Sequence, residues 1–106
     1  MDANKERIRE LNDAFRASFQ GGQVMLTASV DALPSDVRAM AIRKVATFAE
    51  FTPDNDPHGE HDFGSFDLTG RKFFWKIELY EEAGVKTPDG EPLVTRVLTI
   101  MLAEDW

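Results

Sequence analysis

Three stretches in the C-terminal half of the chain are rich in aromatic and β-branched residues, and only short turns separate them. Thr69-Gly70 lies between the first two stretches, and Pro88-Asp89-Gly90 precedes the third. Short turns of this kind join antiparallel neighbours. The stretches therefore predict three strands of one antiparallel sheet, at residues 63–69, 72–81 and 93–102.

The last predicted strand loses its alternation of polar and apolar residues after Leu98 and continues as Thr99-Ile100-Met101-Leu102. A strand with one solvated face keeps polar residues at every second position. The C-terminal half of this strand is therefore predicted to be covered on both faces and to lie in the centre of the sheet.

The N-terminal half shows a different periodicity, because apolar residues in two segments recur at every third or fourth position. That spacing is typical of one face of a helix, and it predicts helices over residues 4–20 and 36–50. Between them, residues 23–30 alternate as the residues of a strand do.

Together these segments predict an α+β fold in which two helices pack on one face of a mostly antiparallel four-stranded sheet, in the order αβαβββ. The length of 106 residues, with 42% hydrophobic and 29% charged residues, is that of a single globular domain, residues 1–106. Arg9, Asp13 and Arg16 are expected to form ion pairs on the solvent side of the first helix.

Composition excludes several classes of protein. The chain has no cysteine, which rules out disulfides, thiolate metal sites and cysteine nucleophiles. It shows no secretory signal, and no apolar run approaches the roughly 18 residues that cross a bilayer, so a cytoplasmic protein is expected. The net charge of −7 argues against direct nucleic-acid binding and would attract a basic protein surface, although solubility alone also explains such a charge.

The most unusual segment runs from Glu50 to Asp67 and contains no lysine or arginine. Its centre, residues 52–64, holds two prolines and two glycines and is predicted to be a long loop. The loop also carries both histidines of the chain together with four carboxylates: Asp54, Asp56, His58, Glu60, His61 and Asp62.

Carboxylates and imidazoles are the usual ligands of divalent cations, so these six residues are candidate metal ligands. A calcium loop that begins at Asp54 would need a glutamate where the chain has Ser65, and the histidine spacing fits no zinc motif. The competing interpretation is that the same side chains only organise the turns of the loop. Hydrolase chemistry would need Ser65 to meet a histidine and a carboxylate in the fold.

The aromatic run Phe73-Phe74-Trp75 favours core packing over base stacking, because few basic residues accompany it. Both faces of a strand cannot be buried in a two-layer domain, so Phe74 and Tyr80 are expected to mark an exposed apolar patch for a partner or a second copy. The candidate binding surface consists of Asp54, Asp56, His58, Glu60, Asp62, Phe74 and Tyr80.

Three segments carry a resemblance to a known family: Phe51-Thr52-Pro53-Asp54-Asn55-Asp56-Pro57-His58-Gly59-Glu60-His61-Asp62-Phe63-Gly64, Phe74-Trp75-Lys76-Ile77 and Thr95-Arg96-Val97-Leu98-Thr99-Ile100-Met101-Leu102. They resemble an uncharacterised bacterial family, the domain of unknown function 3768, and the similarity extends from Ile8 to the C-terminus. The resemblance implies a plasmid- or phage-associated setting, mainly in alphaproteobacteria, and it implies no activity, substrate or catalytic residue.

The leading hypothesis is a non-enzymatic acidic protein that binds or inhibits a basic nucleic-acid-handling protein in a conflict between mobile elements and their hosts. The setting rests only on the resemblance. The alternative is a metal-binding protein or a metal-dependent hydrolase with its site at residues 54–62, and a divalent metal is the one cofactor that the residues suggest. No membrane partner or direct nucleic-acid partner is expected, and a homo-oligomer is left open.

Overall fold

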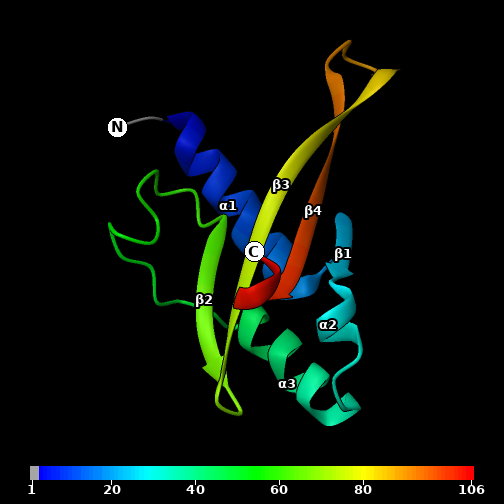
Figure 1. The fold of residues 1–106 in the computed structure, drawn as a ribbon. Helices are drawn as coiled ribbons and strands as arrows, with labels where there is room; N and C mark the ends of the chain where they lie inside the picture. Colours follow the sequence, from blue (N-terminus) through cyan, green and yellow to red (C-terminus); the bar gives the residue numbers. More distant parts are fainter. Residues whose placement is uncertain (1–2) are drawn as a thin grey trace.

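The computed structural model describes residues 3–106 and shows an α+β fold with three α-helices and one four-stranded mixed sheet (Figure 1). The helices are α1 (Ala3–Ser18), α2 (Ala28–Asp31) and α3 (Ser35–Ala46), followed at the C-terminus by the 3-10 turn η1 (Ala103–Asp105). The strands are β1 (Gly22–Leu26), β2 (Phe63–Leu68), β3 (Arg71–Lys86) and β4 (Pro92–Leu102). Within the described part of the chain, no helix is both long and apolar enough to cross a membrane.

The sheet has the strand order β1-β4-β3-β2. β2 pairs antiparallel with β3 and β3 antiparallel with β4, whereas β1 pairs parallel with β4. The prediction of a mostly antiparallel sheet is confirmed. The prediction that the last strand is central is also confirmed, because Ile100 and Met101, on opposite faces of β4, are both buried.

The helices cover one face of the sheet, which we call the inner face. Phe15 of α1, Val30 of α2 and Val45 of α3 are buried there. They pack against alternate residues of the two central strands: Phe73, Trp75, Ile77, Leu98, Ile100 and Leu102. The period of two in β3 and β4 thus supplies one side of the core, and the apolar stripes of the helices supply the other.

The prediction of a strand over residues 23–30 is wrong beyond Leu26, and the number of helices is three instead of two. The Thr27 N–H still reaches the sheet, where it donates to the Ile100 carbonyl, but the Thr27 carbonyl accepts the Asp31 N–H and opens α2. The short helix α2 points Val30 into the core. An apolar residue at this position fits the alternation of a strand equally well, so the pattern could not distinguish the two structures.

Both long helices end earlier than predicted. α1 ends at Ser18 because Phe19 adopts a positive φ of 57°, and α3 ends at Ala46 instead of residue 50. At the end of α3, the side chain of Arg16 donates to the carbonyls of Val45 and Phe48. The Arg16 side chain of α1 therefore donates to backbone carbonyls that would accept N–H groups if α3 continued.

β3 is longer than predicted, because it continues past Glu81 to Lys86. Its pairing with β4 runs to the end of both strands, with an irregularity between Glu81 and Lys86. β1 and β2 stop earlier, so residues 79–95 form a two-stranded ribbon that projects from the body (Figure 1). We call residues 79–95 the arm.

Candidate functional site

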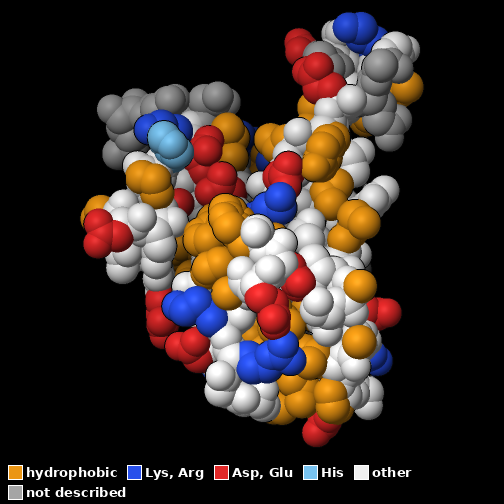
Figure 2. Space-filling view, viewed as in Figure 1, with side chains coloured by type: hydrophobic (Ala, Val, Ile, Leu, Met, Phe, Trp, Pro, Cys, Tyr) orange, Lys and Arg blue, Asp and Glu red, His pale blue; other side chains and the backbone are white. Residues whose placement is uncertain are grey.

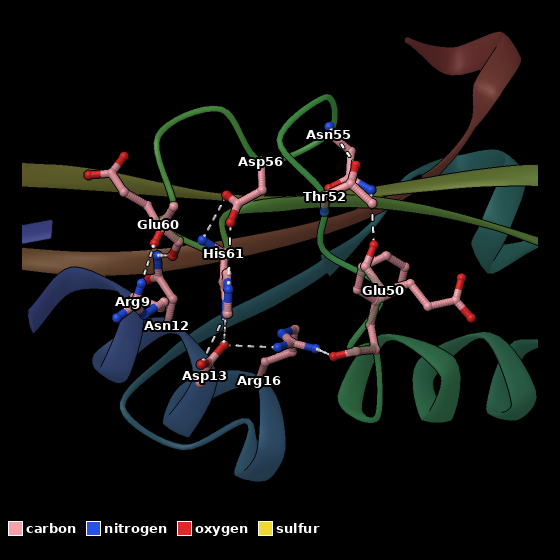
Figure 3. Close-up of polar contacts among 12 residues, drawn as sticks. Arg9, Asn12, Asp13, Arg16, Glu50, Thr52, Asn55, Asp56, Glu60 and His61 are labelled. Atoms are coloured by element: carbon pink, nitrogen blue, oxygen red, sulfur yellow. Dashed lines mark hydrogen bonds and ion pairs between the residues drawn. The ribbon is translucent and has the colours of Figure 1, made fainter. Parts of the chain in front are cut away.

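The acid-rich loop, residues 47–62, connects α3 to β2 and lies against α1 (Figure 3). The Asn12 side-chain amide donates to the Glu60 carbonyl at 3.0 Å, and Arg9 reaches the Gly59 carbonyl at 3.5 Å. Asn12 is itself buried, and its other side-chain atom accepts from Arg96 of β4. The loop is therefore fixed to the helix by contacts that span almost fifty residues of sequence.

His61 is the centre of these contacts. Its Nδ1 lies 2.9 Å and 3.1 Å from the two carboxylate oxygens of Asp13, and its Nε2 lies 3.5 Å from Asp56. Its backbone N–H donates to Asp56 at 3.0 Å, with the residue held at a positive φ of 52°. The imidazole also stacks flat on Phe51 with 3.7 Å between ring centroids. One histidine thus links α1 with both ends of the loop.

Arg16 extends the network to the end of α3. It is 4% exposed, and it donates to Asp13 at 3.0 Å, to the Val45 carbonyl in the last turn of α3 and to the Phe48 carbonyl just after the helix. Its guanidinium lies over the rings of Phe51 and Trp75, 5.2 Å and 5.0 Å from their centroids. The expected Asp13–Arg16 pair exists, but its Arg16 end is buried while Asp13 is partly exposed, so the prediction of a solvent-side ion pair is wrong for Arg16.

The network separates the candidate residues of the loop into two groups. Asp56 and His61 turn inward and hold the loop together. Asp54 and His58 are exposed, and Glu60 and Asp62 are partly exposed. In Figure 3 the Glu60 carboxylate points away from Asn12 and Arg9, which contact backbone carbonyls.

The structure brings two of the six candidate metal ligands, Asp56 and His61, into contact. Among residues 3–106, no group of three or more histidine, aspartate or glutamate side chains has an arrangement that could hold a metal ion. Ser65 lies in β2 opposite Phe74, and in the described part of the chain no hydrogen bond joins it to either histidine.

The loop borders an open hollow of about 470 Å³. Arg9, Phe51, Asp56, His58 and His61 contribute to its lining. A smaller hollow of about 210 Å³ lies beside the end of α3, between Lys44, Phe48 and Phe66. Both are shallow surface features in which the described charged groups have mixed sign.

The two aromatic candidates lie outside the loop. Phe74 is partly buried, because Phe63 and Trp106 pack against it at 5.5 Å. Tyr80 is exposed at the base of the arm, where its hydroxyl donates to Glu78 at 3.0 Å. Hydrogen bonds from Lys76 and then Tyr80 hold the pKa of Glu78 below its ordinary value, and the contact with Glu78 raises the pKa of Tyr80.

Sequence reasoning missed the part that α1 plays in this site. Asn12 and Arg16 lie beside Phe15 on the helix surface, at positions that the helical period places next to the apolar stripe. Polar residues at the edge of an apolar stripe are the sequence feature that could have predicted buried, hydrogen-bonded side chains here. Their partners, however, are defined only by the fold.

A family model described as "Protein of unknown function (DUF3768)" matches residues 26–105 of the chain. The match includes the acid-rich loop, α2, α3 and three complete strands, and α1 precedes it. No curated protein and no solved structure matches the chain.

Proposed function

The chain belongs to the DUF3768 family of proteins of unknown function, and because membership assigns no activity, we propose from the chain's own residues that it is a non-enzymatic binding protein whose acidic loop recognises a basic protein. The observation that carries this proposal is the division of the loop acids. Asp56 holds the loop from inside, which leaves Asp54, Glu60 and Asp62 accessible in a segment without lysine or arginine.

The inward contacts support this proposal, because they order the loop before any partner arrives. A surface that is already ordered loses less conformational entropy when it binds. Figure 2 shows acidic side chains on the lobe at the left and in the hollow between that lobe and the arm. On the arm, Glu81, Asp89 and Glu91 are exposed and add negative charge.

The setting is also part of the proposal. We place the protein in the bacterial cytoplasm, among plasmid- or phage-associated genes, where a basic nucleic-acid-handling protein is the partner that it binds or inhibits. The acidic surface suits this partner because such proteins carry basic patches that contact phosphates.

Native mass spectrometry of protein purified from its own host, before and after chelation, tests the proposal. It reports a bound partner, the oligomeric state and any metal in one sample. A partner rich in basic residues is the expected result. A metal that co-purifies without any partner, and that chelation removes, would overturn the proposal in favour of metal binding by the loop.

Matched variants assign the contact to the loop. Asp54→Asn with Glu60→Gln removes two exposed or partly exposed loop charges, while Asp31→Asn with Asp36→Asn removes two exposed charges near the start of α3. Both pairs change the net charge from −7 to −5. We expect the loop pair to weaken binding about tenfold and the control pair to have little effect. Equal loss of affinity in both pairs would show that only total charge matters.

A further inference from the structure

The face of the sheet opposite the helices, the outer face, carries a cluster of three aromatic rings. Phe63, Phe74 and Trp106 form a triangle in which each pair of ring centroids is 5.5 Å apart. Trp106 covers the two phenylalanines and is still 70% exposed. Figure 2 views this face and shows hydrophobic side chains gathered over the middle of the sheet, with acidic and basic side chains around them.

Trp106 is held in place by the turn that precedes it. The carboxylate of Asp105 accepts hydrogen bonds from the hydroxyls of Thr27 and Ser29 and from the Leu102 N–H, at 2.8–3.0 Å. Glu104 forms an ion pair with Arg71 of β3. A large aromatic side chain that is both exposed and held in position is typical of the anchor residues that dominate protein interfaces.

The charges on the outer strands of this face are balanced. In the pairing register, Asp67 lies opposite Lys72, and Lys76 forms an ion pair with Glu78. Period-two alternation places these four residues on the same face as Phe74. Two acids and two bases of β2 and β3 therefore flank the aromatic triangle, and the turn before Trp106 adds Asp105 and Glu104, of which Glu104 is paired with Arg71.

We propose that the outer face is the interface of a homodimer, in which two copies stack their sheets face to face around the Phe63–Phe74–Trp106 cluster. A surface that carries both charges in nearly equal numbers can complement itself under a two-fold rotation. Because the face carries both signs, two chains of net charge −7 can approach each other there without strong local repulsion. An acidic or a basic partner would leave half of these charges unmatched.

The arrangement follows the known geometry of stacked sheets, which pack about 10 Å apart with their facing side chains interdigitated. The helices of both copies would lie on the outside. The loop residues 54–62 are not part of this face, so the inference does not depend on the proposed function.

Sedimentation equilibrium over a concentration series tests the dimer. The wild-type protein should reach twice the mass of one chain. Trp106→Asp should raise the dimer dissociation constant at least about tenfold, since a central anchor is lost. Met40→Asp is the matched control, because Met40 is an exposed apolar residue of α3 and the change adds the same charge. Wild-type protein that stays monomeric throughout, or a Trp106→Asp variant that dimerises normally, would overturn the inference.

Fluorescence gives a second readout in the same samples. Trp75 is fully buried, so a blue shift of the emission with rising concentration reports Trp106 as the partner covers it. Emission that does not change while the mass doubles would place the interface elsewhere.

Variants with exchanged charges test whether the partner on the outer face is a second copy of the chain. Among the four charged strand residues, Lys76→Glu leaves three acids and one base, and Glu78→Lys leaves one acid and three bases. Each variant alone should dissociate, and an equimolar mixture should form heterodimers. A mixture that remains monomeric, or single variants that dimerise like the wild type, would contradict self-complementarity.

Discussion

At the scale of single residues, the two histidines of one loop differ sharply. His61 contacts two carboxylates and an aromatic ring, whereas His58 is exposed. Histidine is a common metal ligand, and in the sequence these two histidines, three positions apart in the same loop, could not be told apart. The fold gives His61 an organising role and leaves His58 at the surface.

We therefore expect His61→Ala to lower the free energy of unfolding by about 1–3 kcal/mol, because the Asp13 carboxylate loses its hydrogen bond to Nδ1 and the buried Asp56 carboxylate loses its contact with Nε2. His58→Ala should change it by less than about 0.5 kcal/mol. Urea unfolding measures both. His61→Asn is the backbone control, since asparagine tolerates a positive φ. Similar losses of stability in His58→Ala and His61→Ala would contradict the organising role of His61.

Asp105 predicts a pH dependence. Hydrogen bonds from Thr27 and then Ser29 hold its pKa below the ordinary value of 3.8. A carboxylate with a lowered pKa in the folded protein stabilises the fold above its unfolded value, and that contribution disappears as the pH falls through the folded value. Asp105→Asn should therefore melt at a lower temperature than the wild type above pH 3.8, and the gap should close at more acidic pH. A gap that is constant with pH would contradict the prediction.

At the level of the secondary-structure elements, glycines allow close approaches between strands, and one of these lies between β2 and β3. Gly64 of β2 pairs with Trp75 of β3, and a Cβ at position 64 would overlap Nε1 of the Trp75 indole. Trp75 is fully buried beneath the helices and packs at 5.5 Å against Phe48. The indole therefore has little room to move away from an added methyl group.

Gly64→Ala should lower the free energy of unfolding by about 1–3 kcal/mol through overpacking. Ser65→Ala is the neighbouring control, because Ser65 is only partly buried and its side chain faces the other side of the strand. Its effect should be below about 1 kcal/mol. Thermal or urea unfolding of the two variants provides the comparison, and a Gly64→Ala variant as stable as the wild type would show that Trp75 can shift.

At the scale of the whole molecule, charge is distributed unevenly. The segment from Glu50 to Asp67 has no basic residue, while the outer face is balanced between both signs. Attraction between opposite net charges is screened by salt over about 8–10 Å at physiological ionic strength. The two proposed interfaces should therefore respond differently to salt.

We expect the association rate with a basic partner to fall several-fold between low and physiological salt, with a much smaller change in the dimer dissociation constant. Stopped-flow association and sedimentation at matched salt concentrations measure the two quantities. Partner association that is insensitive to salt would remove the acidic loop from the encounter step.

Features that depend on residues close together in the chain could be predicted from the sequence. The period of two after Phe63 and the short turns indicated three antiparallel strands, and the loss of polar alternation after Leu98 indicated the central place of β4. Helical periodicity located α1 and α3, with errors at ends that are decided by a positive φ at Phe19 and by the side chain of Arg16. The contact of Asp13 with His61 across 48 residues of chain, and the packing of Trp106 over Phe74, could be found only in the folded protein. Periodicity indicates which face of an element is buried, whereas the partner on that face depends on how distant elements pack.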